Sequence, residues 1–122
     1  MNLFVVEIEP REKSIKKVEF NKESLGLKDM YSSLECDMVE RVPLKISYND
    51  SLYVYSEVDL WVDEEGGING ASDKIGFFNI GEYQFVGKGL ICGIDVEEGE
   101  SVPFIEDEAD FIVNELKPKI TF

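Results

Sequence analysis

The first twenty residues alternate between apolar and polar side chains in the way that predicts an antiparallel hairpin. Within residues 3–9, the apolar side chains Phe4, Val6 and Ile8 share one face, and glutamates occupy the other toward the end of the run. This period of two is expected of a half-buried strand. A polar segment and a second alternating run, residues 15–20, follow directly, so we expect the two strands to pair.

Two segments, residues 24–35 and 106–116, have the apolar period of an amphipathic helix. Each places apolar side chains at positions i, i+3, i+4 and i+7: Leu27, Met30, Tyr31 and Leu34 in the first, and Ala109, Ile112, Val113 and Leu116 in the second. Ser24 or Asn21 can cap the first helix. Acidic residues crowd the first turn of the second helix, where they favour the helix dipole, and Pro118 ends it.

Three further runs, residues 42–48, 52–62 and 83–96, alternate like strands. Pro43 points to an edge strand or a bulge, because proline cannot donate a hydrogen bond to a neighbouring strand. Together these patterns predict an α+β fold over residues 1–122. We expect a single domain, in which a mainly antiparallel, twisted sheet of about five or six strands carries the two helices.

Glycines recur at odd positions of the run 83–96, at Gly87, Gly89 and Gly93. Without side chains, these positions let another backbone, an aromatic ring or a ligand approach the sheet closely, or they mark bulges and strong coiling. The structural interpretation needs no ligand. The alternative is a small-ligand site in which these glycines lie near Tyr53, Tyr55 or Trp61.

One face of the run 52–62 and its continuation combines aromatic and acidic side chains. Its members are Tyr53, Tyr55, Glu57, Asp59, Trp61 and Asp63. If the sheet is covered on one side only, this stripe faces solvent and forms a recognition surface for a cationic or mixed partner, because aromatic residues are enriched at interfaces. The alternative is that a helix or the chain's own loops cover the aromatic rings.

Charge is distributed unevenly along the chain. The whole sequence has 26 acidic and 12 basic residues, a net charge of −14. Residues 1–48 hold nine acidic and eight basic residues, a net of −1, whereas residues 49–122 hold 17 and four, a net of −13. Such a surface repels nucleic acid and lipid headgroups and favours a basic partner. Two turns concentrate this charge, with the acidic residues Glu64, Glu65, Glu97, Glu98 and Glu100.

The composition also indicates a folded body and excludes several kinds of chemistry. With 122 residues and 43% hydrophobic side chains, the chain can bury a core of its own. It has no histidine, which excludes serine- and cysteine-based catalysis of the histidine-assisted kind and most zinc sites. The P-loop and dinucleotide motifs are absent. Neither acidic turn has the ligand spacing of an EF-hand, so we expect no metal and no cofactor.

The two cysteines, Cys36 and Cys92, follow no apolar leader and do not suggest a disulfide scaffold, so we expect free thiols in the cytoplasm. No apolar run approaches the ~20 residues that cross a bilayer. An enzyme would have to depend on paired carboxylates, such as Asp59 with Asp63 or Glu57, which in a pocket can divide acid and base roles. We expect no enzyme, because no catalytic motif is present.

The central segment resembles a family of small domains of unknown function that occurs in phages, plasmids and other mobile elements of bacteria. The resemblance rests on LWVDEEGG over residues 60–67, on Asn69-Gly70, and on FVGKGLICGID with the following Glu98-Gly99 over residues 85–99. Members of that family commonly have a small residue, proline, asparagine and arginine after asparagine-glycine. This chain has Ala71-Ser72-Asp73 there, so no role of the proline or arginine is implied for it.

The predicted function is therefore a non-enzymatic protein-interaction or regulatory module of a phage or mobile element, whose acidic half docks on a basic protein surface. Two alternatives stay open. One is a mimic of nucleic acid that inhibits a host DNA-binding enzyme with spaced carboxylates. The other is a small-ligand-binding domain. The sequence predicts no direct binding to nucleic acid or membrane, and it does not fix the oligomeric state.

Overall fold

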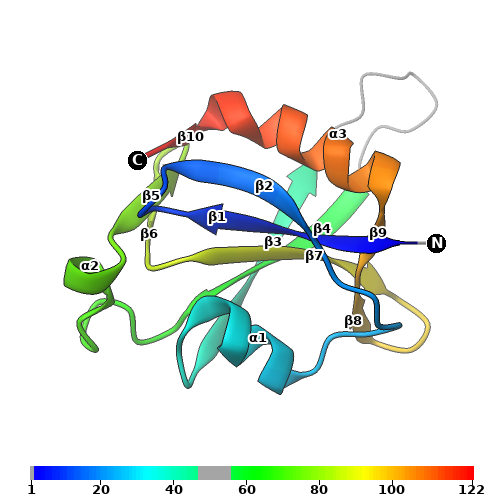
Figure 1. Ribbon diagram of the computed structural model, residues 1–122, viewed down its shortest axis with the longest axis horizontal. Helices are drawn as coiled ribbons and strands as arrows, with labels where there is room; N and C mark the ends of the chain where they lie inside the picture. The colour runs from blue at the N-terminus through cyan, green and yellow to red at the C-terminus, as the bar shows by residue number, and fades with distance from the viewer. Residues whose placement is uncertain (1, 47–55) are drawn as a thin grey trace.

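The computed structural model describes residues 2–46 and 56–122 of the chain and has an α+β fold, as predicted (Figure 1). Its strands are β1 (Leu3–Glu9), β2 (Ser14–Glu19), β3 (Val39–Ile46), β4 (Ser56–Asp63), β5 (Phe77–Ile80), β6 (Tyr83–Val86), β7 (Gly89–Asp95), β8 (Glu100–Val102), β9 (Phe104–Ile105) and β10 (Ile120–Thr121). Its helices are α1 (Leu27–Leu34), α2 (Ala71–Lys74), α3 (Glu106–Leu116) and the 3-10 turn η1 (Lys117–Lys119).

The strands form two antiparallel sheets. In the main sheet the order is β2-β1-β7-β4-β3, with β8 paired to β7 and β9 to β1. The smaller sheet has the order β10-β5-β6. The predicted hairpin of β1 and β2 is present, and β3 is an edge strand, as Pro43 indicated. The structure adds short strands of two to four residues, which are too brief to give a period of their own.

Both faces of the main sheet are covered. Helix α3 and the small sheet pack on one face, and α1 crosses the other (Figure 1). The first core contains Val6, Ile8, Val58, Leu60, Val62, Phe78, Ile91, Phe104, Ala109, Ile112, Leu116 and Ile120. The second core contains Val5, Leu25, Met30, Leu34, Leu90 and Cys92. The central strands β1 and β7 therefore bury residues of both parities, unlike strands with one solvated face.

The glycines of β7 accommodate aromatic rings. A Cβ atom at Gly89 would lie 2.8 Å from Cζ of Phe78, and one at Gly93 would lie 3.3 Å from Cε1 of Phe104. Both phenylalanines belong to the core that α3 covers. The structural interpretation of the glycine stripe is thus confirmed: aromatic rings of the core lie against Gly89 and Gly93. These two positions leave no room for a ligand against the sheet.

Helix α3 occupies the predicted residues, whereas α1 begins three residues later than expected. Gly26 takes the N-cap position, and its N–H donates to Oδ2 of Asp29 at 2.9 Å. Residues 24 and 25 lie outside the helix because Leu25 forms a bridge with Ser101 of β8. The expected caps are wrong: the Asn21 side chain accepts a hydrogen bond from the N–H of Leu3 instead. Leu27 consequently lies at the start of α1 and is 55% exposed.

The single strand expected over residues 83–96 is divided. Gly87 has a φ of 92°, a left-handed conformation that glycine adopts without strain, and its N–H donates to the carbonyl of Gly76 at 2.8 Å. Residues before this point form β6 in the small sheet, and residues after it form β7 in the main sheet. The chain therefore crosses from the small sheet to the main sheet at Gly87. The alternation of apolar and polar residues does not reveal this crossing.

Candidate functional site

Helix α1 is shorter than the sheet that it crosses, and a hollow lies at each of its ends. The hollow at its N-terminal end has a volume of about 540 Å³ and is bounded by β3, β4 and the β7–β8 hairpin. We call it the aromatic groove and define it by Leu27, Met30, Arg41, Asp59, Trp61 and Glu100. Its volume lies in the range of about 300–1,000 Å³ that is typical of ligand pockets.

An ion pair between a buried carboxylate and an exposed guanidinium lies in the aromatic groove. Asp59 is only 3% exposed, and its Oδ1 accepts a hydrogen bond from Nε of Arg41 at 3.0 Å. The register that pairs Arg41 with Trp61 places this arginine diagonally across from Asp59 on the same face of the sheet. Burial raises the pKa of Asp59 above its usual value, and the Arg41 guanidinium offsets part of that shift.

Trp61 contributes the aromatic surface of the groove. Its side chain is half-buried, and its Nε1 is buried without a hydrogen-bond partner among the described residues. The indole lies beside the Cys92 thiol but does not reach hydrogen-bond geometry with it. An unsatisfied buried donor costs about 1–3 kcal/mol, so the ring is held here by its apolar packing against α1 and not by its polar atom.

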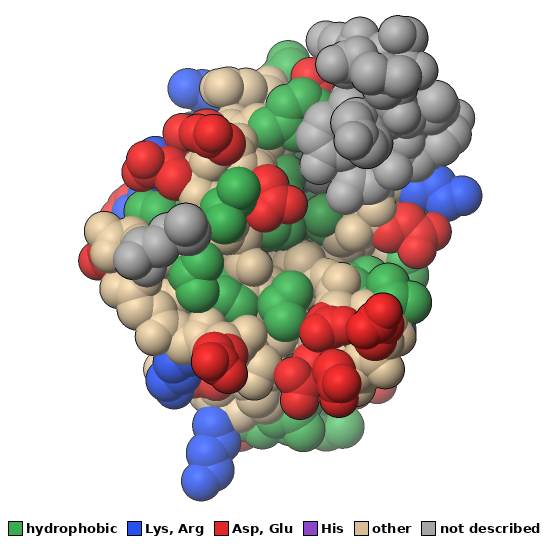
Figure 2. All heavy atoms as spheres, turned by 90° about the vertical axis from the view of Figure 1, so that its right-hand side faces the viewer, with side chains coloured by type: hydrophobic (Ala, Val, Ile, Leu, Met, Phe, Trp, Pro, Cys, Tyr) green, Lys and Arg blue, Asp and Glu red, His purple; other side chains and the backbone are tan. Residues whose placement is uncertain are grey.

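The β7–β8 hairpin places an acidic turn at the rim of the aromatic groove. Oδ1 of Asp95 accepts hydrogen bonds from the N–H groups of Glu97 at 3.1 Å and Glu98 at 3.3 Å, which fixes the turn. Glu97, Glu98 and Glu100 are exposed, and none of them forms an ion pair within the described residues. Val96 is 88% exposed beside them. Figure 2 shows the side of the molecule that lies to the right in Figure 1, where acidic side chains border hydrophobic ones.

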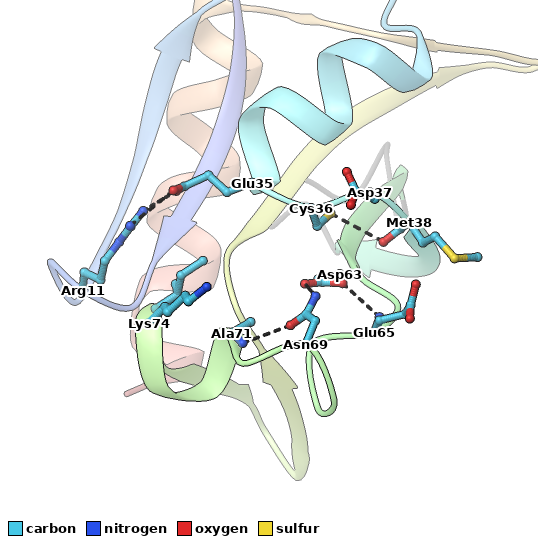
Figure 3. A pocket seen from close by; sticks show the side chains of 11 residues that line it. Arg11, Glu35, Cys36, Asp37, Met38, Asp63, Glu65, Asn69, Ala71 and Lys74 are labelled. Carbon is cyan, nitrogen blue, oxygen red and sulfur yellow. Dashed lines mark hydrogen bonds and ion pairs between the residues drawn. The ribbon is translucent and has the colours of Figure 1, made fainter.

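A second hollow, of about 570 Å³, lies at the C-terminal end of α1 (Figure 3). We call it the polar cleft and define it by Arg11, Asp37, Asp63, Glu65, Asn69 and Lys74. Asp63 is 8% exposed, and its carboxylate accepts hydrogen bonds from the N–H of Glu65 at 2.9 Å and from Nδ2 of Asn69 at 2.7 Å. These bonds fix its position between the end of β4 and the loop that leads to α2.

An ion-pair network beside the polar cleft ties the end of α1 to the first hairpin. Arg11 bonds both Glu9, at 2.6 Å, and Glu35, which ends α1 in a left-handed conformation with a φ of 57°. Lys88 pairs with Glu7 at 3.3 Å. Burial by itself would raise the pKa of Glu9, but its hydrogen bonds with Arg11 outweigh burial and lower that pKa.

The predicted aromatic and acidic stripe is only partly solvent-facing. Glu57 is exposed, but Asp59 and Asp63 are buried and Trp61 is half-buried, because α1 covers this face of the sheet. The alternative, in which a helix covers the rings, is therefore correct for Trp61. Tyr53 and Tyr55 lie outside the described residues. The structure brings Asp59 and Trp61 together with Glu100, and it places Asp63 in the other hollow with Glu65.

The two acidic turns lie at opposite ends of the molecule. Residues 64–67 follow β4 and residues 96–99 follow β7, and these neighbouring strands are antiparallel (Figure 1). The sequence patterns missed Arg41 and Leu27 as site residues. The exposed first position of the apolar stripe of α1 was the available signal for Leu27. Arg41 had none, since only the pairing of β3 with β4 brings it to Asp59.

The thiols are expected to react slowly in the folded protein. Burial raises the pKa of both Cys36 and Cys92 from 9.0 to about 11, and the nearby Asp63 carboxylate adds to the shift of Cys36. Near neutral pH, alkylation by iodoacetamide should therefore be about two orders of magnitude slower in the folded chain than in the unfolded chain, because only the thiolate reacts.

A raised thiol pKa also has a consequence for stability. The contribution of the buried, neutral thiols to the free energy of unfolding is fully present below pH 9.0. It is lost as the pH rises from 9.0 to about 11, because the thiols of the unfolded chain ionise first. Mass-spectrometric mapping of alkylated peptides and denaturant melts across this range measure both effects. Fast labelling of native Cys36 near neutral pH would contradict the prediction.

Comparison with protein families finds a match that extends well beyond the central segment. Residues 1–117 match the domain of unknown function DUF3846. The chain belongs to the DUF3846 family. No curated protein and no solved structure matches this DUF3846 chain. Within residues 2–46 and 56–122, no helix is long and apolar enough to cross a membrane, and no group of three or more acidic or cysteine side chains is placed to hold a metal ion.

Proposed function

We propose that this DUF3846 protein is a non-enzymatic interaction module that binds a basic segment of a partner protein at the aromatic groove. The observation that carries the proposal is the position of Trp61 and Leu27 directly beside the acidic turn of the β7–β8 hairpin. An apolar side chain of the partner would fill the groove, and its lysine or arginine side chains would meet the carboxylates at the rim.

The groove has the composition of an interaction hot spot. Tryptophan and arginine are the residues most enriched at such positions, and Trp61 and Arg41 lie next to each other across β3 and β4. Leu27 and Val96 expose apolar side chains near the groove and on the adjacent turn. Burial of apolar side chains of this size against a partner removes them from water and favours binding.

The rim supplies charge that the molecule itself does not neutralise. Glu97, Glu98 and Glu100 lie in one turn and are exposed, with no lysine or arginine of the described residues paired to them. Unpaired carboxylates attract a basic partner over the ~10 Å screening length at 0.1 M salt and speed its encounter. Association should therefore weaken as the salt concentration rises.

Asp59 and Asp63, one of the two carboxylate pairs considered for catalysis, lie in different hollows. Asp59 is paired with Arg41, and Asp63 is held by Glu65 and Asn69 in the other hollow. Four residues along a strand separate Asp59 from Asp63 by about 13 Å, given a rise of about 3.3 Å per residue. A glycosidase pair lies at about 5–9.5 Å, so these two carboxylates are not positioned to divide acid and base roles.

A displayed library of random peptides tests the proposal. We expect selected peptides to combine an aromatic or aliphatic residue with lysine or arginine. Reversing the rim charges in a Glu97→Lys, Glu98→Lys, Glu100→Lys variant should weaken binding at least about tenfold at low salt, because close charge pairs then become repulsive. Titration calorimetry of two selected peptides gives the change in affinity.

A matched variant separates the groove from overall charge. Glu64→Lys, Asp73→Lys and Glu82→Lys change the net charge equally at exposed positions away from the aromatic groove. This variant should keep most of the affinity. Equal weakening by both variants, or selected peptides without basic residues, would overturn the proposal. A nucleic-acid mimic, by contrast, would bind a DNA-binding enzyme in competition with duplex DNA.

The proposal includes a cytoplasmic setting in a phage, plasmid or other mobile element. It is supported by the free thiols of Cys36 and Cys92 and by the resemblance of the central segment to domains of such elements. Neighbouring genes test this part directly. Genes for replication, restriction or conjugation beside several relatives would favour it, whereas a consistent setting among biosynthetic genes of the host chromosome would contradict it.

A further inference from the structure

The polar cleft separates its charges onto two facing walls. Figure 3 shows Arg11 and Lys74 on one side and Asp37, Asp63 and Glu65 on the other. We call the first pair the cationic wall and the second set the acidic wall. The cationic wall comes from the β1–β2 turn and the last residue of α2, and the acidic wall comes from the segment after α1, the end of β4 and the loop that follows.

The two walls do not neutralise each other. Among the described residues, Lys74 forms no ion pair, and neither do the three members of the acidic wall. Arg11 is already bonded to Glu9 and to Glu35, and Glu35 itself lines the cleft. Lys74 is therefore the cation that the cleft offers, and the hollow of about 570 Å³ keeps it apart from the acidic wall.

The acidic wall contains one carboxylate in an unusual position. Asp63 is more than nine-tenths buried, yet the groups that bond it are neutral, namely the N–H of Glu65 and the amide of Asn69. A buried charge without a counter-ion is costly, and a cation brought into the cleft would reduce that cost. The same hydrogen bonds hold the carboxylate in place before any ligand arrives, so little ordering is needed on binding.

We propose that the polar cleft binds a small zwitterion, a molecule that carries one ammonium and one carboxylate, such as an amino acid. The ammonium meets Asp63 and Glu65, and the carboxylate meets Lys74. Both contacts are charge-assisted hydrogen bonds, which are stronger than neutral ones. A ligand with one charge can form an ion pair with only one wall, and the charges of the other wall stay unpaired. This site is separate from the aromatic groove, so the assignment does not depend on the proposed partner binding.

Three matched sets of small molecules test the assignment by titration calorimetry. The first contains ω-amino acids from glycine to 6-aminohexanoate, the second contains alkyl amines of the same chain lengths, and the third contains the corresponding carboxylates. At least one ω-amino acid should bind about tenfold more tightly than its matched amine and its matched carboxylate. The chain length that binds best reports the distance between the walls in solution.

Variants of the cleft locate the binding. Lys74→Ala should reduce the affinity of the best ω-amino acid to that of its matched amine, and Glu65→Gln should reduce it at least several-fold. Glu64→Gln is the control, because Glu64 is the exposed neighbour of Glu65 and does not line the cleft. The charge-reversed variant of the β7–β8 turn should bind the ligand normally, which separates this site from the proposed function.

Two results would overturn the assignment. One is equal binding of amines and ω-amino acids at every length, with no effect of Lys74→Ala, since the cleft would then be a site for cations alone. The other is no heat of binding from any of the molecules up to about 10 mM, about tenfold above the dissociation constant of about 1 mM of a weak site. Thermal melts of each variant without ligand show whether any loss of binding comes from loss of the fold.

Discussion

Replacing Phe78 with alanine is expected to lower the free energy of unfolding by about 3–5 kcal/mol, the range typical of a buried phenylalanine. Phe78 is 0% exposed and lies in β5, where its ring packs against the main sheet. The ring also meets Phe85 of β6 at a centroid distance of 5.3 Å. Since a domain of this size has about 5–15 kcal/mol of stability in total, the loss would remove a large part of it.

The neighbouring residue provides the control for this prediction. Phe77 precedes Phe78 in the same strand but is 45% exposed, because successive side chains of a strand point to opposite faces. Phe77→Ala should cost less than about 1 kcal/mol, as is usual at exposed positions. Urea denaturation followed by circular dichroism measures both variants. Equal losses would mean that the small sheet does not seal the core as the structure indicates.

Replacing Gly89 with alanine is expected to cost about 1–3 kcal/mol, the usual effect of overfilling a packed core. The new Cβ would lie 2.8 Å from Cζ of Phe78, 3.1 Å from Cδ1 of Leu60 and 3.3 Å from Cδ1 of Ile8. All three neighbours are fully buried, so none can move without disturbing others. Gly67→Ala is the control, because no atom lies within 4 Å of the Cβ it would introduce, and we expect it to be nearly neutral.

Substitutions at positions 78 and 89 should be coupled, because the Phe78 ring is the nearest neighbour of the Cβ atom introduced at Gly89. In a Phe78→Leu background the shorter side chain leaves space, and Gly89→Ala should cost about 1 kcal/mol less than in the wild type. Four denaturation curves complete this double-mutant cycle. Strict additivity would show that the strain at position 89 comes from Leu60 and Ile8 and not from the phenylalanine.

Most of the fold could be predicted from periodicity. The period of two in residues 3–9 and the helical period in residues 106–116 correspond to β1 and α3. The helical prediction succeeds because one side of α3 is buried and the other is solvated. Strand β1 is covered on both faces, and its period of two is visible because Glu7 and Glu9 hold alternate positions, where they form ion pairs with Lys88 and Arg11. Residues 83–96 failed as one strand because Gly87 redirects the backbone, and the change of direction depends on tertiary contacts.

The candidate sites were less predictable than the fold. Trp61 was predicted as a partner-binding residue and Glu100 as part of an acidic turn, and the structure places both around one hollow. Their common location results from the pairing of β4 with β7 and of β7 with β8. The polar cleft was not predicted at all. Its members come from segments separated by up to about sixty residues, and no local pattern connects them.

The sequence by itself determined the α+β class, the lack of histidine chemistry and the concentration of negative charge in two turns and one helix start. These follow from composition and from local periods, which each segment carries independently of the rest. Tertiary structure decided that α1 covers the face of Asp59, Trp61 and Asp63, because only packing determines which strand face a short helix crosses. It thereby divided one predicted stripe between an aromatic groove and a polar cleft, at opposite ends of the same helix.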